Sequence, residues 1–310
     1  MILQDGQQII KTRDDAEPVI LDRLAILQDA NKRFKLSANV TCSWAKDEEE
    51  LGPEKLRPRI EPWLTALVQS EHLSLLVGSG LTQAVNQLAV VKPAPWMSNI
   101  DFKTFKKEIE IEANRSAKAA GRNTANFEDQ LRVANELLRG LEIIASTKTE
   151  DPSEREQIEG LRQELTEALS SFAGSMLEAE RNLASASNDK PEIAFNYLVS
   201  FLMSFASRSG TRDRLHLFTT NYERYIEAGA DVAGLRLIDR FVGTLTPVFR
   251  ASRLDVDMHY NPPGIRGEPR YLEGVARFTK LHGSIDWVDC HKAIRRFGLP
   301  FGAEDINPYL

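Results

Sequence analysis

Three short segments carry the residue types in this chain that could do chemistry. They are Gly78-Ser79-Gly80, Thr219-Thr220-Asn221-Tyr222-Glu223 and His282-Gly283, and each lies at the end of an apolar run. Short apolar runs that end in glycine or polar residues are typical of strands buried in a parallel sheet. Open α/β sheets bind their ligands at the carboxyl ends of such strands. The three segments therefore predict a parallel sheet with a dinucleotide site at its carboxyl edge.

The glycine segment is suited to phosphate. It follows a strand expected over residues 73–77 and precedes residues that could begin a helix. Glycine lets the backbone approach a pyrophosphate closely, and a helix N-terminus supplies N–H donors. A dehydrogenase would carry a third glycine at position 83 and an acidic residue about 20 positions later. Gln83 and the lack of a strand ending in an acid argue against hydride transfer, whereas a tight turn without ligand stays open for this segment alone.

Asn221 and His282 are the side chains with catalytic potential. Asn221 offers a donor and an acceptor, which could hold a ribose hydroxyl or a water against a sugar carbon; the alternative is a helix N-cap. Gly283 predicts a sharp turn that leaves the His282 imidazole over the sheet edge as a general base. The alternative there is a buried core histidine. Glu128 and Asp129 stand at an expected helix start, where the helix dipole explains acids without any function.

The remaining histidines and the cysteines predict no metal site and no disulfide, because their spacing fits neither. This leaves reduced thiols as the expected state. The residues concerned are Cys42, Cys290, His72, His216, His259 and His291.

The elements that would position the three segments belong to one α/β domain over residues 55–310, after a helical or irregular lead-in over residues 1–54. Periodicity predicts a helical block over residues 102–207, inserted between the first strand and the strand that bears Asn221. The part over 153–187 reads as a solvated helix or as an arm for self-association or a partner. The predicted helices cover 54–70, 102–118, 126–146, 151–188, 192–207 and 222–233, and the predicted strands cover 73–77, 214–219, 236–241, 277–281 and a hairpin return at 284–288. The apolar first strand is expected to be covered by helices on both faces.

Composition limits the classes of function. The formal net charge of −6 over 310 residues argues against a surface devoted to nucleic acid, which needs clustered Lys and Arg. The N-terminus lacks the basic and apolar regions of a signal peptide, and no apolar stretch approaches membrane-spanning length. We therefore expect a cytoplasmic, soluble protein without a membrane partner.

Taken together, the three segments resemble the NAD-binding and catalytic signature of the sirtuin superfamily. Gly78-Ser79-Gly80-Leu81-Thr82 is similar to the sirtuin Gly-Ala-Gly-x-Ser loop, residues 219–223 to its Thr-Gln-Asn-x-Asp loop, and His282-Gly283 to its catalytic His-Gly. The longer strings at 218–222 and 280–287 are closer still to the sirtuin-like proteins of bacterial antiphage defence. The resemblance covers mainly residues 73–85 and 213–289. It implies a Rossmann-like sheet with a large helical insertion.

The resemblance also implies residue roles. Gly78 and Gly80 would contact the NAD phosphates, Asn221 would hold the nicotinamide ribose and the hydrolytic water, and His282 would act as base near the ribose hydroxyls. Glu223 stands where the family has Asp. Its side chain is longer by one methylene, and this difference affects the contact to the nicotinamide carboxamide. The implied catalytic residues are Asn221 and His282, and the implied NAD-binding residues are Gly78, Ser79, Gly80, Thr82, Thr220, Tyr222, Glu223 and Gly283, with no metal.

The implied activity is that of an NAD+ hydrolase, which cleaves the nicotinamide–ribose bond to give nicotinamide and ADP-ribose. In antiphage defence this reaction depletes NAD and aborts the infection. The resemblance implies control by homo-oligomer assembly or by a partner such as a HerA-family ATPase or a short Argonaute. Two alternatives stay open: a non-catalytic NAD or ADP-ribose binding module for assembly, and a protein deacylase or ADP-ribosyltransferase, which the missing four-cysteine zinc module disfavours.

The segments after His282 contain no later strand and glycine turn of the kind that sirtuins use to hold the adenosine half of NAD. We therefore expect the C-terminal part of the fold to be missing from this chain. A poor rate of NAD hydrolysis by the chain alone follows, because remote binding energy helps to orient the reacting centre.

Overall fold

The computed structural model describes residues 7–12, 15–24, 33–92, 98–147, 151–186, 189–208, 212–260 and 270–303. Its contacts divide the chain into two compact units. One comprises Met1–Leu73 with Arg208–Arg214, and the other comprises Ser74–Ser207 with Leu215–Leu310. The boundary predicted at residue 54 stays a prediction and falls inside the first unit, at the start of a helix.

The first unit contains a small antiparallel sheet and one helix. The strands β1 (Gln7–Ile10), β2 (Val19–Arg23) and β3 (Phe34–Leu36) pair in that order, and α1 covers Pro53–Val68. Their core consists of Val19, Leu21, Leu36, Trp44 and Leu51. The helix confirms the prediction over 54–70, but the helical or irregular lead-in predicted for residues 1–54 is wrong at β1, β2 and β3, which are strands. Strands of three to five residues are too short for their alternation to stand out in a polar sequence.

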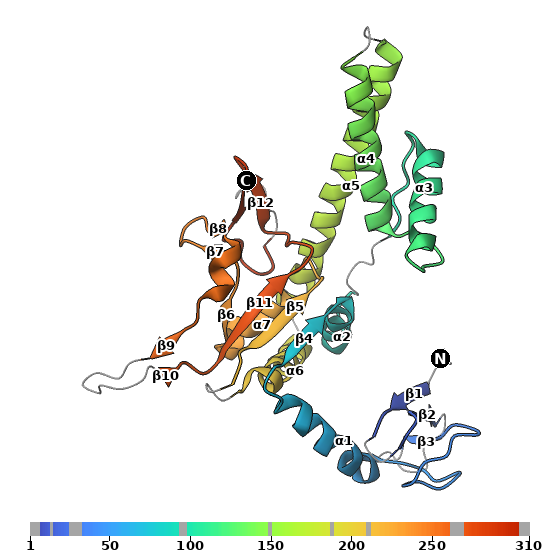
Figure 1. Cartoon of the computed structure of the whole chain (residues 1–310), viewed down its shortest axis with the longest axis vertical. Coiled ribbons are helices and arrows are strands. Elements are labelled where there is room, and N and C mark those ends of the chain that lie inside the picture. Colours follow the sequence, from blue (N-terminus) through green and yellow to red (C-terminus); the bar gives the residue numbers. More distant parts are fainter. Residues whose placement is uncertain are drawn as a thin grey trace. The chain divides into compact units, whose positions relative to one another are not determined.

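The second unit is built on a four-stranded parallel sheet with the order β4-β5-β11-β6. Its strands are β4 (Ser74–Val77), β5 (Leu215–Thr219), β6 (Arg236–Ile238) and β11 (Val275–Lys280). Val77 pairs with Thr219, and Thr219 pairs with Lys280. These three strands therefore end at the same level, and the three segments that follow them begin at one edge of the sheet (Figure 1). The predicted α/β class with a parallel, Rossmann-like sheet is confirmed.

Between β4 and β5, the described elements are all helices. They are α2 (Ser79–Ala89), α3 (Lys106–Ala119), α4 (Phe127–Ala145), α5 (Pro152–Ala184) and α6 (Lys190–Ala206); α7 (Tyr225–Ala233) follows β5. Leu215, Leu217, Ala276 and Phe278 are buried on one sheet face, and α6 and α7 lie behind the sheet in Figure 1. The expectation that helices cover the edge strand β4 on both faces is wrong, because Leu76 is 67% exposed.

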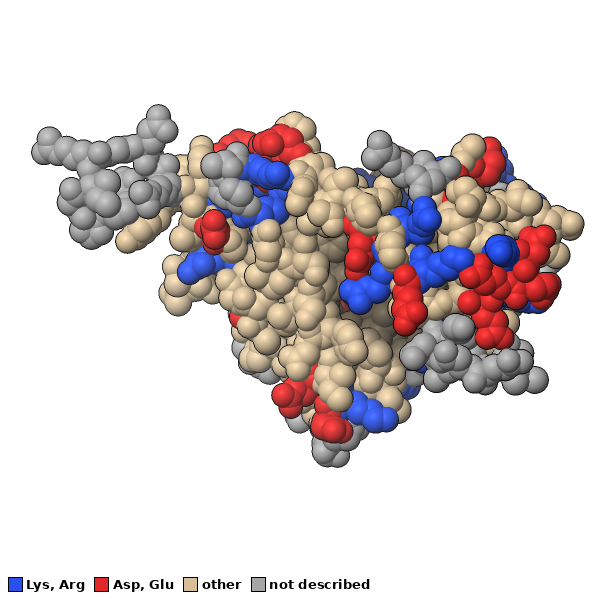
Figure 2. Space-filling model, turned by 90° about the horizontal axis from the view of Figure 1, so that it is seen from below, with Lys and Arg blue, Asp and Glu red and all other residues tan. Residues whose placement is uncertain are grey.

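Helices α4 and α5 run side by side, and α3 packs on α4 (Figure 1). Local signals set their ends. Asn126 and Asp129 form a capping box at the start of α4, and Asp151 caps α5, whose first residue is Pro152. Buried Phe102, Ile109, Val133 and Leu161 contribute to the core between these helices. Figure 2 shows acidic and basic side chains close together at several places on the face that it draws. The long helices carry exposed ion pairs of their own, such as Arg132 with Glu136 and Arg162 with Glu159.

A second, antiparallel sheet has the order β12-β13-β8-β7. Its strands are β7 (Phe241–Val242), β8 (Val248–Phe249), β12 (Trp287–Cys290) and β13 (Ala293–Arg296). A short 3-10 helix, η1 (Ala251–Asp255), and the antiparallel pair β9 (His259–Tyr260) and β10 (Arg270–Tyr271) lie between β8 and β11 in the chain.

Two strand predictions are corrected by this sheet. The single strand predicted at 236–241 is divided between β6 and β7, which belong to different sheets. The strand predicted at 284–288 begins at Trp287 and pairs with β13 instead of returning along β11. Trp287 explains the change, because its ring packs on Phe241 and Phe249, with centroids 4.9 and 6.0 Å away. Among the described residues, no helix combines the length and apolar content that a membrane crossing requires.

Candidate functional site

The glycine turn leads directly from β4 into α2. Gly78 is the N-cap residue with extended backbone, and no side chain caps this helix start. A Cβ on Gly80 would meet nothing within 4 Å, and one on Gly78 would lie 3.8 Å from the Thr220 hydroxyl oxygen. Neither packing nor a left-handed backbone therefore requires glycine at these two exposed positions. Together with the exposed Ser79, they leave open space beside a helix N-terminus, which is where anions bind.

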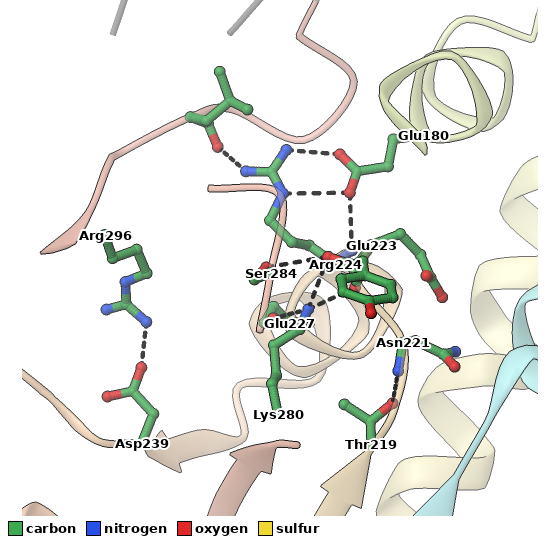
Figure 3. A network of polar contacts seen from close by, with 12 residues as sticks. Glu180, Thr219, Asn221, Glu223, Arg224, Glu227, Asp239, Lys280, Ser284 and Arg296 are labelled. Atoms are coloured by element: carbon green, nitrogen blue, oxygen red, sulfur yellow. Dashed lines mark hydrogen bonds and ion pairs between the residues drawn. The ribbon is translucent and has the colours of Figure 1, made fainter. Parts of the chain in front are cut away.

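Asn221 lies against this turn. Its side-chain Nδ2 donates to the Gly78 carbonyl oxygen and to the Thr82 hydroxyl oxygen, both at 3.1 Å. Its backbone N–H donates to the Thr219 hydroxyl at 3.0 Å (Figure 3). Its Oδ1 has no hydrogen-bond partner within the part of the chain that the structure describes. Helix α7 has Arg224 as its N-cap residue, so the alternative of Asn221 as an N-cap is wrong.

Thr82 and Glu223 complete a buried cluster with Asn221. The Thr82 hydroxyl donates to the Glu223 carboxylate, and the residues are 3% and 7% exposed. This arrangement joins the first and second sequence segments, which stand 141 positions apart at this contact. It also shows that the longer Glu223 side chain reaches back to α2. The contact expected between residue 223 and a nicotinamide carboxamide stays a prediction.

Lys280, at the end of β11, holds the turn that bears Asn221. Its buried Nζ donates to the carbonyl oxygens of Tyr222 at 3.3 Å and Glu223 at 2.7 Å, and to the Glu227 carboxylate at 2.9 Å (Figure 3). Burial raises the pKa of the Glu227 carboxyl, and the neighbouring Lys280 charge opposes that effect. The Ser284 hydroxyl adds a bond to the Tyr222 carbonyl at 3.1 Å. Sequence reasoning missed Lys280, although a lysine at the end of a predicted strand, two positions before His282, is a usable signal.

A buried ion pair ties the same turn to α5. Arg224 donates to the Glu180 carboxylate at 2.6 Å and to the Pro300 carbonyl at 3.0 Å, and it also contacts the Leu299 carbonyl. The two side chains are buried (Figure 3). Glu180 additionally accepts the backbone N–H of Arg224 at 2.8 Å. No local pattern links residues 180 and 224, so this pair was not predicted.

His282 follows β11 at the carboxyl edge. Gly283 has φ +94°, which confirms the predicted sharp turn after it. The imidazole is 40% exposed, and its Nδ1 lies 3.1 Å from the Glu128 carboxylate. Its exposure excludes the alternative of a buried core histidine.

Tyr222 shares the carboxylate that His282 contacts. Its hydroxyl donates to the same Oε1 atom of Glu128, also at 3.1 Å. The Tyr222 and His282 rings have centroids 6.1 Å apart. Burial, followed by the charge of Glu128, raises the pKa of Tyr222 to about 12, so this residue acts as a hydroxyl donor near neutral pH.

No family model matches the chain, and no curated protein matches its sequence.

The structure brings most of the predicted site residues to one sheet edge. Gly78, Thr82, Asn221 and Glu223 form one hydrogen-bonded cluster. Tyr222 and His282 form a second cluster around Glu128, which sequence reasoning had assigned to the helix dipole alone. Ser79 and Gly80 lie at the exposed start of α2, and the backbone of Thr220 donates to the Val77 carbonyl. Gly283 turns the chain between β11 and β12.

A cavity of about 710 Å³ lies beside the residues that anchor the turn at Asn221. Arg224, Glu227, Lys280, Asp286 and Trp287 are among its lining residues, whereas Gly78, Asn221 and His282 are not. Three of these lining residues, Arg224, Glu227 and Lys280, also anchor the turn at Asn221. The glycine turn itself faces open space, which suits an extended ligand lying along the sheet edge.

Proposed function

We propose that this chain binds NAD+ and hydrolyses its nicotinamide–ribose bond. The observation that carries the proposal is the state of Asn221. Its amide nitrogen is held by Gly78 and Thr82, which leaves Oδ1 free to accept a hydrogen bond beside the uncapped start of α2. An amide fixed in this way is positioned to orient a water or a ribose hydroxyl.

The phosphates of NAD+ would lie at the start of α2. There the backbone N–H groups and the helix dipole favour negative charge, and Gly78 and Gly80 let the ligand approach. Ser79, Thr82 and Thr220 surround the same turn. Glu223 would act mainly by holding the Thr82 hydroxyl, and through it Asn221, because its carboxylate is engaged there.

The reaction needs no strong acid, because the nicotinamide leaves as a neutral molecule. The bond between the ribose anomeric carbon and the nicotinamide nitrogen breaks, and positive charge spreads over the ribose as in glycoside hydrolysis. A water held by Asn221 Oδ1 forms the new carbon–oxygen bond. His282 accepts the proton of that water, directly or through the ribose hydroxyls. The products are nicotinamide, ADP-ribose and one proton.

The cellular role that we propose rests on the resemblance to sirtuin-like defence proteins. It is NAD depletion during phage infection, gated by self-assembly or by a partner such as a HerA-family ATPase or a short Argonaute. The products formed from NAD+ distinguish this role from NAD-dependent control of assembly and from protein modification.

The test is chromatography of NAD+ incubated with the purified chain, with and without an acetylated peptide. We expect nicotinamide and ADP-ribose, and a loss of at least about 100-fold in rate for Asn221→Ala and for His282→Ala. His259→Ala, an exposed histidine on β9, is the matched control and should retain the wild-type rate. A folded Asn221 or His282 variant with wild-type turnover would refute the catalytic assignment. Binding without cleavage would favour the assembly module, and peptide-dependent products would favour a modifying enzyme.

A further inference from the structure

The helical block between β4 and β5 sends one carboxylate into the candidate site. Glu128 is the second residue of α4 and lies 154 positions before His282 in the chain. Its Oε1 atom is 3.1 Å from His282 Nδ1 and 3.1 Å from the Tyr222 hydroxyl. The carboxylate therefore joins two residues that follow different strands of the sheet.

The chemistry of this contact determines which ring nitrogen carries the proton. A carboxylate only accepts hydrogen bonds, so the neutral imidazole must donate from Nδ1. Its Nε2 is then left without a proton, and it has no partner within the described parts of the chain. A histidine whose Nδ1–H is held by a carboxylate is oriented to accept a proton at Nε2.

Capping does not account for Glu128. The neighbouring Asp129 accepts the Asn126 backbone N–H at 3.0 Å and pairs with Arg122 at 2.6 Å. The capping box therefore uses the Asp129 carboxylate. The helix dipole favours an acid at either position, but only the Glu128 side chain turns to His282. Its contacts thus need an explanation that the helix start does not provide.

Aromatic packing holds the start of α4 against the candidate site. Phe127 stacks on Phe172 of α5, with ring centroids 4.8 Å apart, and the rings of Phe172 and Tyr222 are perpendicular, with centroids 5.2 Å apart. Tyr222 in turn donates to Glu128. These contacts connect Phe127 with the neighbouring Glu128 through Phe172 and Tyr222. They limit how far the carboxylate can move from His282.

We propose that Glu128 is a positioning residue, which fixes the tautomer and the orientation of His282 and makes the helical block part of the site. The role in catalysis rests on the proposed NAD+ hydrolysis; the effect on the imidazole does not. A rearrangement of α4 and α5 would then reach the proposed base through one carboxylate. Any partner or self-association that moves these helices would change the activity by that route.

The direct test is the tautomer of His282, read from a long-range proton–nitrogen correlation spectrum of the 15N-labelled full chain. The pH is set where histidines are neutral, and His282→Ala identifies the signals. We expect the Nδ1–H tautomer in the wild type and its loss in Glu128→Ala. Glu128→Gln keeps an oxygen acceptor and should retain much of it. Glu136→Ala is the matched control, because Glu136 lies on the same helix and pairs with the exposed Arg132.

The kinetic test separates positioning from substrate binding. For Glu128→Ala we expect kcat to fall about 10- to 100-fold while KM changes little. A wild-type His282 in the Nε2–H tautomer would overturn the proposal without any variant, as would an unchanged tautomer in Glu128→Ala. A raised KM with unchanged kcat would also overturn it. Because the spectrum requires no turnover, a chain that fails to cleave NAD+ would refute the proposed function and leave the positioning of His282 to be judged by its tautomer.

Discussion

Gly80→Ala should make the protein more stable and at the same time weaken its binding of NAD+. Gly80 is the second residue of α2, and a Cβ there would meet nothing within 4 Å. The fold therefore gains from alanine, which loses less backbone entropy than glycine when it becomes helical. If the glycine is present for the ligand, the same methyl group occupies the space that a phosphate would approach.

The two effects have different sizes. Alanine in place of glycine stabilises a helix interior by up to about 1 kcal/mol, and near the helix start we expect about 0.5 kcal/mol. In a unit of this size that corresponds to a melting temperature about 1–2 °C higher. Displacing the phosphate from one backbone N–H removes a hydrogen bond to a charged group, worth about 1.5–3 kcal/mol. The dissociation constant for NAD+ should then rise about 10- to 100-fold.

Thermal unfolding and calorimetric titration with NAD+ measure the two quantities on the same sample. Gly140→Ala is the matched control, because Gly140 lies inside α4 and its Cβ also meets nothing within 4 Å. It should raise stability and leave the affinity for NAD+ unchanged. If Gly80→Ala gains stability and binds NAD+ as the wild type does, the glycine turn does not cradle phosphate and the reasoning is refuted.

Two further predictions concern stability. Hydrogen bonds from Arg122 hold the pKa of Asp129 below its usual range, so its stabilising contribution is complete above the unfolded pKa near 3.8 and is lost as the pH falls through the lower folded value. Unfolding measured against pH should show this acid-dependent loss in the wild type and not in Asp129→Asn, and equal slopes would contradict it. Glu180→Ala leaves Arg224 as a buried charge without its partner and should cost about 3–5 kcal/mol in urea unfolding; a loss below about 1 kcal/mol would show that the pair does not anchor the turn.

Several features of the second unit were predictable because their signals are local. Asn126 and the pair Asp151-Pro152 marked helix starts, and the structure places caps at both. The strands before Gly78, Asn221 and His282 were identified from short apolar runs, and each ends within a residue or two of the predicted position. Cap chemistry and periodicity depend on neighbours within one turn or one strand, so a single sequence contains them.

Strands of two to five residues were harder to predict. The antiparallel sheet of β7, β8, β12 and β13 depends on the rings of Phe241, Phe249 and Trp287 meeting in space. The small sheet of the first unit depends on the burial of residues as distant as Val19 and Trp44. In such strands the partner, and not the local pattern, decides whether a segment becomes a strand.

The amino-acid sequence by itself determined which residues stand at the candidate site, because strand-end motifs and the parallel order of the strands lead to one edge. Tertiary structure alone decided what holds them. Lys280 and Arg224 anchor the turn of Asn221 through Glu227 and Glu180, and Glu128 reaches His282 across 154 positions. A surface acid at a helix start and an acid that orients an imidazole have the same sequence pattern. They differ only in what packing brings within hydrogen-bond distance, and that depends on how the helical block folds against the sheet.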